Sequence, residues 1–222
     1  MNWPLLKKAR SKPINHFFDK LTFPTGGLGL VIGGGGSGKS RWAEDLACHL
    51  NNEISAATRS ADSSPPLYLA TLFVGDDQES ARRVARHRSQ RAGKGFETIE
   101  LPFLPENIRS TSSMPPYGRV VLLDCLGNLA ANQMFLTNER LSSPTIENQI
   151  TDFVIALSRH SRYTIVVSND LFSNAESFAD ETGAYLALMG GLHRQLAAGA
   201  DLVVELLQGI PKIHKGGNSV ER

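Results

Sequence analysis

The sequence predicts an α/β fold of three layers, in which helices cover both faces of a mostly parallel β-sheet. Short apolar runs alternate along the chain with longer helical patterns, as in repeated strand–helix units. The apolar runs show no polar–apolar alternation, which suits strands that are buried on both faces of a parallel sheet. A chain of 222 residues is long enough for one sizeable domain of this kind and short for two.

The strands are expected where the continuous apolar runs occur. Gly29-Leu30-Val31-Ile32 and Val120-Val121-Leu122-Leu123 are clear examples. The segment Gln208-Gly209-Ile210-Pro211 either breaks the last strand or forms the tip of a hairpin. In chain order, the strands are predicted at 28–33, 67–71, 96–100, 120–124, 164–168 and 202–207.

Helical patterns and loops fill the rest of the chain. Residues 55–66 and 109–118 are rich in Ser, Pro and Ala and are expected to be loops. Residues 1–26 show no clean period, so we expect an N-terminal extension followed by a single domain over 27–222. The helices are predicted at 39–50, 76–92, 146–160 and 176–198.

A glycine-rich loop joins the first strand to the first helix and fits the pattern G-x-x-x-x-G-K-[ST]. Its glycines let successive backbone N–H groups point at one anion, and the helix N-terminus adds partial positive charge there. Lys39 would reach the β- and γ-phosphates of a nucleotide as a catalytic group, and Ser40 would bind Mg²⁺. An accidental match would leave only a glycine-rich turn. The loop comprises Gly33, Gly34, Gly35, Gly36, Ser37, Gly38, Lys39 and Ser40.

A second signal of a nucleotide site is the strand Val120-Val121-Leu122-Leu123-Asp124. A buried strand that ends in a carboxylate is the Walker-B pattern, in which Asp124 would hold Mg²⁺ directly or through water. Many strands end in Asp, so this signal gains its weight from the glycine-rich loop.

The charged segment 76–91 contains His87 and reads as a helix. From composition alone it is a solvated helix, with Glu79 and Arg83 as an i,i+4 pair and His87 as a surface histidine.

The order of these motifs resembles the bifunctional adenosylcobinamide kinase/adenosylcobinamide-phosphate guanylyltransferase family of cobalamin biosynthesis. The resemblance covers about residues 28–213. The motifs that carry it are Gly34–Ser40 with Arg41 and Glu44, Tyr68–Thr71, the His87–Arg91 helix, Phe96–Glu100, Leu122–Leu126, Asn132, Val167–Asp170, Leu196–Asp201 and Gly209–Pro211.

The resemblance implies a P-loop NTPase of RecA-like fold with two activities. The first phosphorylates the aminopropanol hydroxyl of adenosylcobinamide with ATP or GTP. The second transfers GMP from GTP to that phosphate through a guanylylated histidine, which gives adenosylcobinamide-GDP and pyrophosphate. His87 matches the nucleophilic histidine. The matching nucleotide contacts outside the glycine-rich loop are Ala70, Thr71, Leu72, Arg88, Ser89, Gln90, Arg91, Glu100 and Asp124.

The chain departs from the family pattern at several motifs. Gly35-Gly36 stands where Ala-Arg is usual, which removes a positive charge close to the phosphates, and Phe96 replaces a tryptophan. These changes leave open whether both activities are kept. Two other hypotheses remain: another P-loop kinase of small metabolites, in which His87 is only a surface residue, and a nucleotide-gated binding protein without transfer activity.

Composition limits the partners. The formal net charge of +1 gives no global field for nucleic acid or an anionic membrane. No apolar run approaches the roughly 20 residues of a membrane span. The two cysteines, Cys48 and Cys125, form no disulfide framework and suit a reducing cytoplasm. We therefore expect a cytoplasmic enzyme with a corrinoid and nucleoside triphosphates as substrates and Mg²⁺ as cofactor. A homo-oligomer is compatible with the sequence.

Overall fold

The structure is a computed structural model of the chain. It describes residues 15–58, 64–73, 85, 89, 92–105, 118–137, 141–171 and 181–217.

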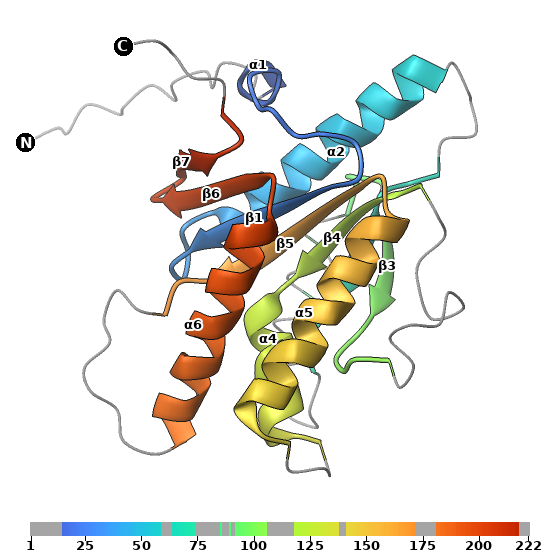
Figure 1. Ribbon diagram of the computed structural model, residues 1–222. Helices are drawn as coiled ribbons and strands as arrows, with labels where there is room; N and C mark the ends of the chain where they lie inside the picture. Colours follow the sequence, from blue (N-terminus) through green and yellow to red (C-terminus); the bar gives the residue numbers. More distant parts are fainter. Residues whose placement is uncertain are drawn as a thin grey trace, which may run out of the picture.

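A seven-stranded sheet forms the centre of the described part of the molecule (Figure 1). Its strand order is β3-β2-β4-β5-β1-β6-β7, and all neighbouring pairs are parallel except β6 and β7. The strands are β1 (Gly27–Gly33), β2 (Leu67–Ala70), β3 (Glu97–Glu100), β4 (Val120–Asp124), β5 (Tyr163–Asn169), β6 (Leu202–Leu207) and β7 (Ile210–Lys215).

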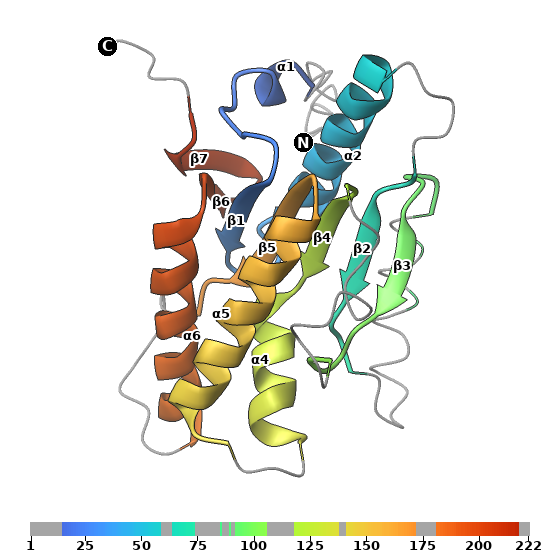
Figure 2. The same ribbon diagram turned by 45° about the vertical axis from the view of Figure 1, so that its right-hand side comes forward.

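Helices cover both faces of this sheet (Figures 1 and 2). One face carries α1 (Asn15–Phe18) and α2 (Lys39–Thr58), and the other carries α4 (Leu126–Phe135), α5 (Ser143–His160) and α6 (Glu181–Gly199). Each face has its own core of buried apolar side chains. Leu46 and Ile165 belong to the core under α2, whereas Phe153 belongs to the core under α5. The expected three-layer sandwich with a mostly parallel sheet is confirmed, and β1 runs through the glycine-rich loop into α2, as expected of a P-loop.

The strand order brings the predicted nucleotide motifs to one edge of the sheet. β5 lies between β1, which leads into the glycine-rich loop, and β4, which ends in Asp124. In register, Gly33 pairs with Asn169, and Asp124 pairs with Val167. The carboxyl ends of parallel strands meet at one edge, where ligands bind in open α/β sheets.

The predicted strands are confirmed to within a residue or two, and the hairpin alternative for Gln208–Pro211 is confirmed by β7. The predicted loop at 55–66 is wrong over its first residues, because α2 continues to Thr58. Ser55 and Thr58 donate side-chain hydrogen bonds to carbonyls one turn back, at 2.8 and 3.0 Å, and so remain compatible with the helix.

The other helix predictions have different outcomes. α5 begins three residues early, where Ser142 caps it by accepting a hydrogen bond from the Thr145 N–H. The predicted helix at 76–92 lies outside the described residues, except that residues 85 and 89 are helical and residue 92 is in a turn. Of the predicted helix at 176–198, residues 176–180 lie outside the described part. Most of the loop at 109–118 does so too.

Part of the predicted N-terminal extension packs on the sheet domain. Phe18 is buried, and its ring lies 5.3 Å from that of Trp42 on α2. Leu21 forms a bridge with Gly217, and the Thr22 N–H donates to the Gly216 carbonyl at 2.7 Å. None of the described helices is both long enough and apolar enough to cross a membrane.

Candidate functional site

The predicted phosphate loop curls tightly between β1 and α2. Gly36 and Gly38 have φ angles of 72° and 87°, in the left-handed region that glycine adopts without strain. The Trp42 N–H donates to the Gly38 carbonyl at 3.0 Å, so the first helical turn begins inside the loop. Lys39 Nζ donates to the Gly34 carbonyl at 3.2 Å, which holds its ammonium group across the loop. A cation and backbone N–H groups therefore meet at the start of α2.

Two neighbouring segments support the loop. At Gly33, an added Cβ would lie 2.5 Å from Ser37 Oγ and 2.8 Å from the Leu206 carbonyl oxygen, so only glycine fits. The tip of the β6–β7 hairpin meets the loop where the Gly209 N–H donates to the Ser37 carbonyl at 2.9 Å. The end of β5 meets it where the Asp170 N–H donates to the Gly33 carbonyl at 2.9 Å. The β6–β7 turn and the end of β5 therefore hold the loop in place, and the sequence had not connected either of them to it.

The carboxylate of Asp124 is half-buried at the carboxyl end of β4. It accepts a hydrogen bond of 2.7 Å from the phenol of Tyr68 on the neighbouring strand β2. This contact orients one carboxylate oxygen. Asp124 and the phosphate loop lie at the same edge of the sheet, separated by β5.

The segment after β2 is tied to the start of α4. Thr71 is fully buried, and its hydroxyl donates to the Cys125 carbonyl and accepts from the Cys125 N–H, both at 2.7 Å. Asn132 of α4 donates to the carbonyls of Thr71 and Pro102, at 2.9 and 2.7 Å. The hydroxyl of Thr71 is therefore engaged with protein groups. Ala70 is buried, and Leu72 is half-buried.

Burial shifts the titration of two groups near this edge. It raises the pKa of the Cys125 thiol to about 11, so the thiol is neutral at pH 7. It also raises the pKa of Tyr185 to about 12, and the Tyr185 hydroxyl donates to the Gly127 carbonyl at 3.0 Å. Both side chains pack as neutral groups beside the first turn of α4.

One partly buried pair in this region was missed by sequence reasoning. Ser168 Oγ of β5 and His193 Nε2 of α6 lie 2.7 Å apart. Burial lowers the pKa of His193, although the negative charge of Asp170 acts in the opposite direction. The sequence carries no sign of this contact, because Ser168 and His193 are 25 residues apart and only the fold brings them together.

Comparison with known proteins places the chain in a family. The model of the cobinamide kinase / cobinamide phosphate guanyltransferase family matches residues 29–213. The chain belongs to this family.

Its curated relatives are matched over nearly their whole length. The chain is 30% identical over 190 residues to the bifunctional adenosylcobalamin biosynthesis protein CobP of Pseudomonas aeruginosa, which covers 84% of this chain and 96% of the relative. It is 28% identical over 191 residues to the bifunctional adenosylcobalamin biosynthesis protein CobU of Escherichia coli, and this match covers 82% of this chain and 96% of the relative. Among solved structures it is similar to the flagellar accessory protein FlaH of Methanocaldococcus jannaschii, with a TM-score of 0.49, 11% identity, and coverage of 93% of this chain and 87% of that chain.

In this cobinamide kinase family member, several predicted nucleotide contacts come from the segment between β2 and β3. His87, Arg88, Gln90 and Arg91 lie outside the described residues, and Ser89 is helical and exposed. Glu100 is exposed at the end of β3, opposite Ala70 in register.

The carboxyl-terminal end of this segment, at Lys94, is fixed to α2. Lys94 Nζ lies 2.8 Å from Glu44 Oε2 and 2.7 Å from Asp45 Oδ1. Both carboxylates lie in the second turn of the helix that begins with the predicted phosphate loop. The segment between β2 and β3 carries His87 and is called the histidine-bearing segment. Its end at Lys94 is therefore held close to the start of α2, where the predicted phosphate loop lies.

Proposed function

We propose that this protein phosphorylates the aminopropanol hydroxyl of adenosylcobinamide with ATP or GTP. It then transfers GMP from GTP to the resulting phosphate and gives adenosylcobinamide-GDP. The proposal rests on one combination: a phosphate loop and a strand-end carboxylate at the same sheet edge, in a chain that its family model matches over residues 29–213. The relatives named above are bifunctional proteins of adenosylcobalamin biosynthesis.

The kinase step uses the loop at the start of α2. The N–H groups of Gly34–Ser40 bind the β- and γ-phosphates, and Lys39 leaves the Gly34 carbonyl to contact the transferring phosphate. Ser40 and Asp124 offer the hard oxygen donors that Mg²⁺ prefers, and they would hold it at this edge. Bound Mg²⁺ neutralises charge on the triphosphate. Tyr68 keeps the Asp124 carboxylate oriented for this role.

The guanylyl step proceeds through His87. Its unprotonated imidazole nitrogen attacks the α-phosphorus of GTP, and the bond from that phosphorus to the bridging oxygen breaks, so that pyrophosphate leaves. A phosphate oxygen of adenosylcobinamide phosphate then attacks the same phosphorus. The phosphorus–nitrogen bond breaks, and the free imidazole is restored. Arg88 and Arg91 steady the phosphate oxygens, and Ala70, Thr71, Leu72, Ser89, Gln90 and Glu100 complete the nucleotide site.

The setting follows from these substrates. Residues 27–222 act as one transferase domain in the cytoplasm, on a corrinoid and nucleoside triphosphates and not on nucleic acid. If the protein assembles, it does so as a homo-oligomer.

The deciding experiment incubates the purified protein with Mg²⁺ and α-labelled GTP and follows intact-protein mass and retained label. An acid-labile GMP adduct is expected in the wild type and in His160→Ala, and is expected to be absent in His87→Ala. His160 is a suitable control because it ends α5 at the opposite edge of the sheet, where the Gly118 N–H donates to its carbonyl at 3.0 Å.

The kinase step is measured separately, as phosphorylation of adenosylcobinamide. His87→Ala should retain it, whereas Lys39→Ala should lose it. Absence of any adduct despite measurable GTP binding would reduce the proposal to a kinase, and unchanged phosphorylation in Lys39→Ala would contradict the phosphate-loop assignment.

A further inference from the structure

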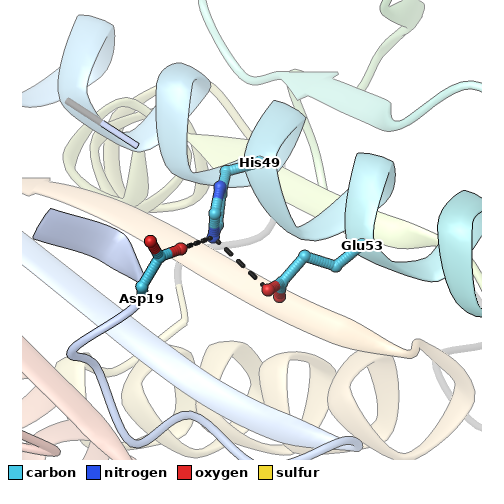
Figure 3. Close-up of side chains that lie close together, drawn as sticks. All are labelled: Asp19, His49 and Glu53. Carbon is cyan, nitrogen blue, oxygen red and sulfur yellow. Dashed lines mark ion pairs between the residues drawn. The ribbon is translucent and has the colours of Figure 1, made fainter. Parts of the chain in front are cut away.

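A cluster of three metal-ligating side chains lies where α2 faces α1, apart from the residues of the predicted nucleotide motifs. Asp19 follows α1, whereas His49 and Glu53 are one helical turn apart on α2 (Figure 3). One donor atom from each residue lies within 4.8 Å of the other two. The cluster joins two segments that are separated by the whole of β1 and the phosphate loop.

The two carboxylates are directed at the same imidazole nitrogen (Figure 3). His49 Nε2 lies 3.4 Å from Asp19 Oδ1 and 3.6 Å from Glu53 Oε1. These separations exceed the usual 2.7–3.2 Å of an N–H···O hydrogen bond. They are close to the spacing of about 3.3–3.5 Å that separates neighbouring ligand atoms around a tetrahedral zinc ion with bonds of about 2.0–2.1 Å.

The imidazole is the anchored member of the cluster. Its side chain is 12% exposed, and its ring lies 5.4 Å from that of the buried Phe18. The side chains of Asp19 and Glu53 are 51% and 58% exposed, so water reaches both carboxylates. An imidazole, two carboxylates and open positions for water suit a borderline ion such as Zn²⁺ better than Mg²⁺ or Ca²⁺.

A second histidine–carboxylate pair shows the contrast. His214 Nε2 lies 2.9 Å from Glu205 Oε2, a hydrogen-bond distance, and the Lys212 ammonium lies 4.0 Å from the same oxygen. That pair offers one carboxylate and a neighbouring cation, which disfavours a metal ion. It supplies the matched control.

We propose that Asp19, His49 and Glu53 bind one divalent transition-metal ion of the zinc type, which fastens the segment after α1 to the phosphate-loop helix. The ion is structural and takes no part in phosphoryl transfer. This inference does not depend on the proposed function.

The test titrates Co²⁺, a spectroscopic substitute for Zn²⁺, into the metal-free, tag-free full chain without nucleotide, and follows the visible absorption and bound stoichiometry. One ion is expected per chain, and Zn²⁺ should displace it. His49→Gln should weaken binding by roughly 10- to 100-fold or more, since even outer partners of a metal ion have effects of that size. His214→Gln should bind as the wild type does.

Asp19→Asn and Glu53→Gln change exposed side chains and keep the test valid if His49→Gln fails to fold. Each should weaken Co²⁺ binding while the circular dichroism stays that of the wild type. Binding that survives all three substitutions, or that is lost in His87→Ala instead, would overturn the proposal. So would the absence of Co²⁺ binding.

Discussion

The phenolic hydroxyl of Tyr68 donates a hydrogen bond of 2.7 Å to the carboxylate of Asp124, from the strand next to it in the sheet. Tyr68 is buried, so its hydroxyl has a fixed position. Tyr68→Phe removes this donor and frees the carboxylate to rotate. Because the proposed metal ligand is then less well oriented, we expect kcat of the kinase step to fall about tenfold and the Mg²⁺ requirement to rise.

Steady-state kinetics at several Mg²⁺ concentrations measure this effect. Tyr163→Phe is the matched control, because the Tyr163 hydroxyl lies 3.4 Å from the hydroxyl of the exposed Thr25, where the chain enters β1, away from Asp124. Equal Mg²⁺ dependence in the wild type and in Tyr68→Phe would show that the hydrogen bond has no role in catalysis.

The sheet and the phosphate loop could be predicted because their signals are local. A continuous apolar run such as Val120–Leu123 indicates a buried strand without knowledge of its neighbours. Short or non-periodic elements were not predicted. α4 begins right after β4, and its first residues, Leu126, Leu129 and Ala130, are as buried as the strand. Its cap residue Cys125 makes no side-chain capping bond, so the sequence carries no signal that separates the helix from the strand.

The contacts that shape the site could not be predicted, because their partners are distant in sequence. Lys94 and Glu44 are 50 positions apart, and Ser168 and His193 are 25 apart. From the sequence alone, a charged residue in a polar segment is expected to be exposed to solvent, because its partner in the fold is not known. The glycine-rich loop itself could therefore be predicted from its sequence, whereas the distant groups that contact the site could not.

The ion pair of Lys94 with Glu44 and Asp45 gives a second prediction. Glu44 is 7% exposed, so Lys94→Met leaves a nearly buried carboxylate unpaired and releases the end of the histidine-bearing segment. We expect formation of the GMP adduct to slow about tenfold, while the kinase step changes less than about twofold.

Rapid-quench measurement of adduct formation, with phosphorylation of adenosylcobinamide beside it, separates the two effects. Lys212→Met serves as the control, because Lys212 is 63% exposed and lies 4.0 Å from its carboxylate partner. A parallel loss of both activities in Lys94→Met would indicate general destabilisation, and the positioning role would be rejected.

Asn132 gives a prediction about stability. Its amide donates to the Thr71 and Pro102 carbonyls, and the side chain is buried. Asn132→Ala leaves both carbonyls without this donor, so we expect the free energy of unfolding to fall by about 1–3 kcal/mol. Urea unfolding measures the change, and Asn128→Ala, at a half-buried position of the same helix, should cost less. Equal losses in the two variants would mean that the hydrogen bonds of Asn132 add nothing beyond lost packing.

His193 makes the stability of the fold depend on pH. Burial lowers its pKa below the ordinary value of 6.5, against the smaller opposing effect of the Asp170 charge. Between the lowered folded value and 6.5, the unfolded chain binds more protons than the folded chain, so stability rises with pH through that window. The stability that the neutral imidazole allows is present at pH 7 and is lost as the pH falls through the lowered pKa of the folded state. His193→Gln keeps an amide nitrogen near Ser168 and cannot titrate. Urea unfolding at pH 5, 6 and 7 should therefore show a shallower decline for His193→Gln than for the wild type, and parallel curves would exclude His193 as the source.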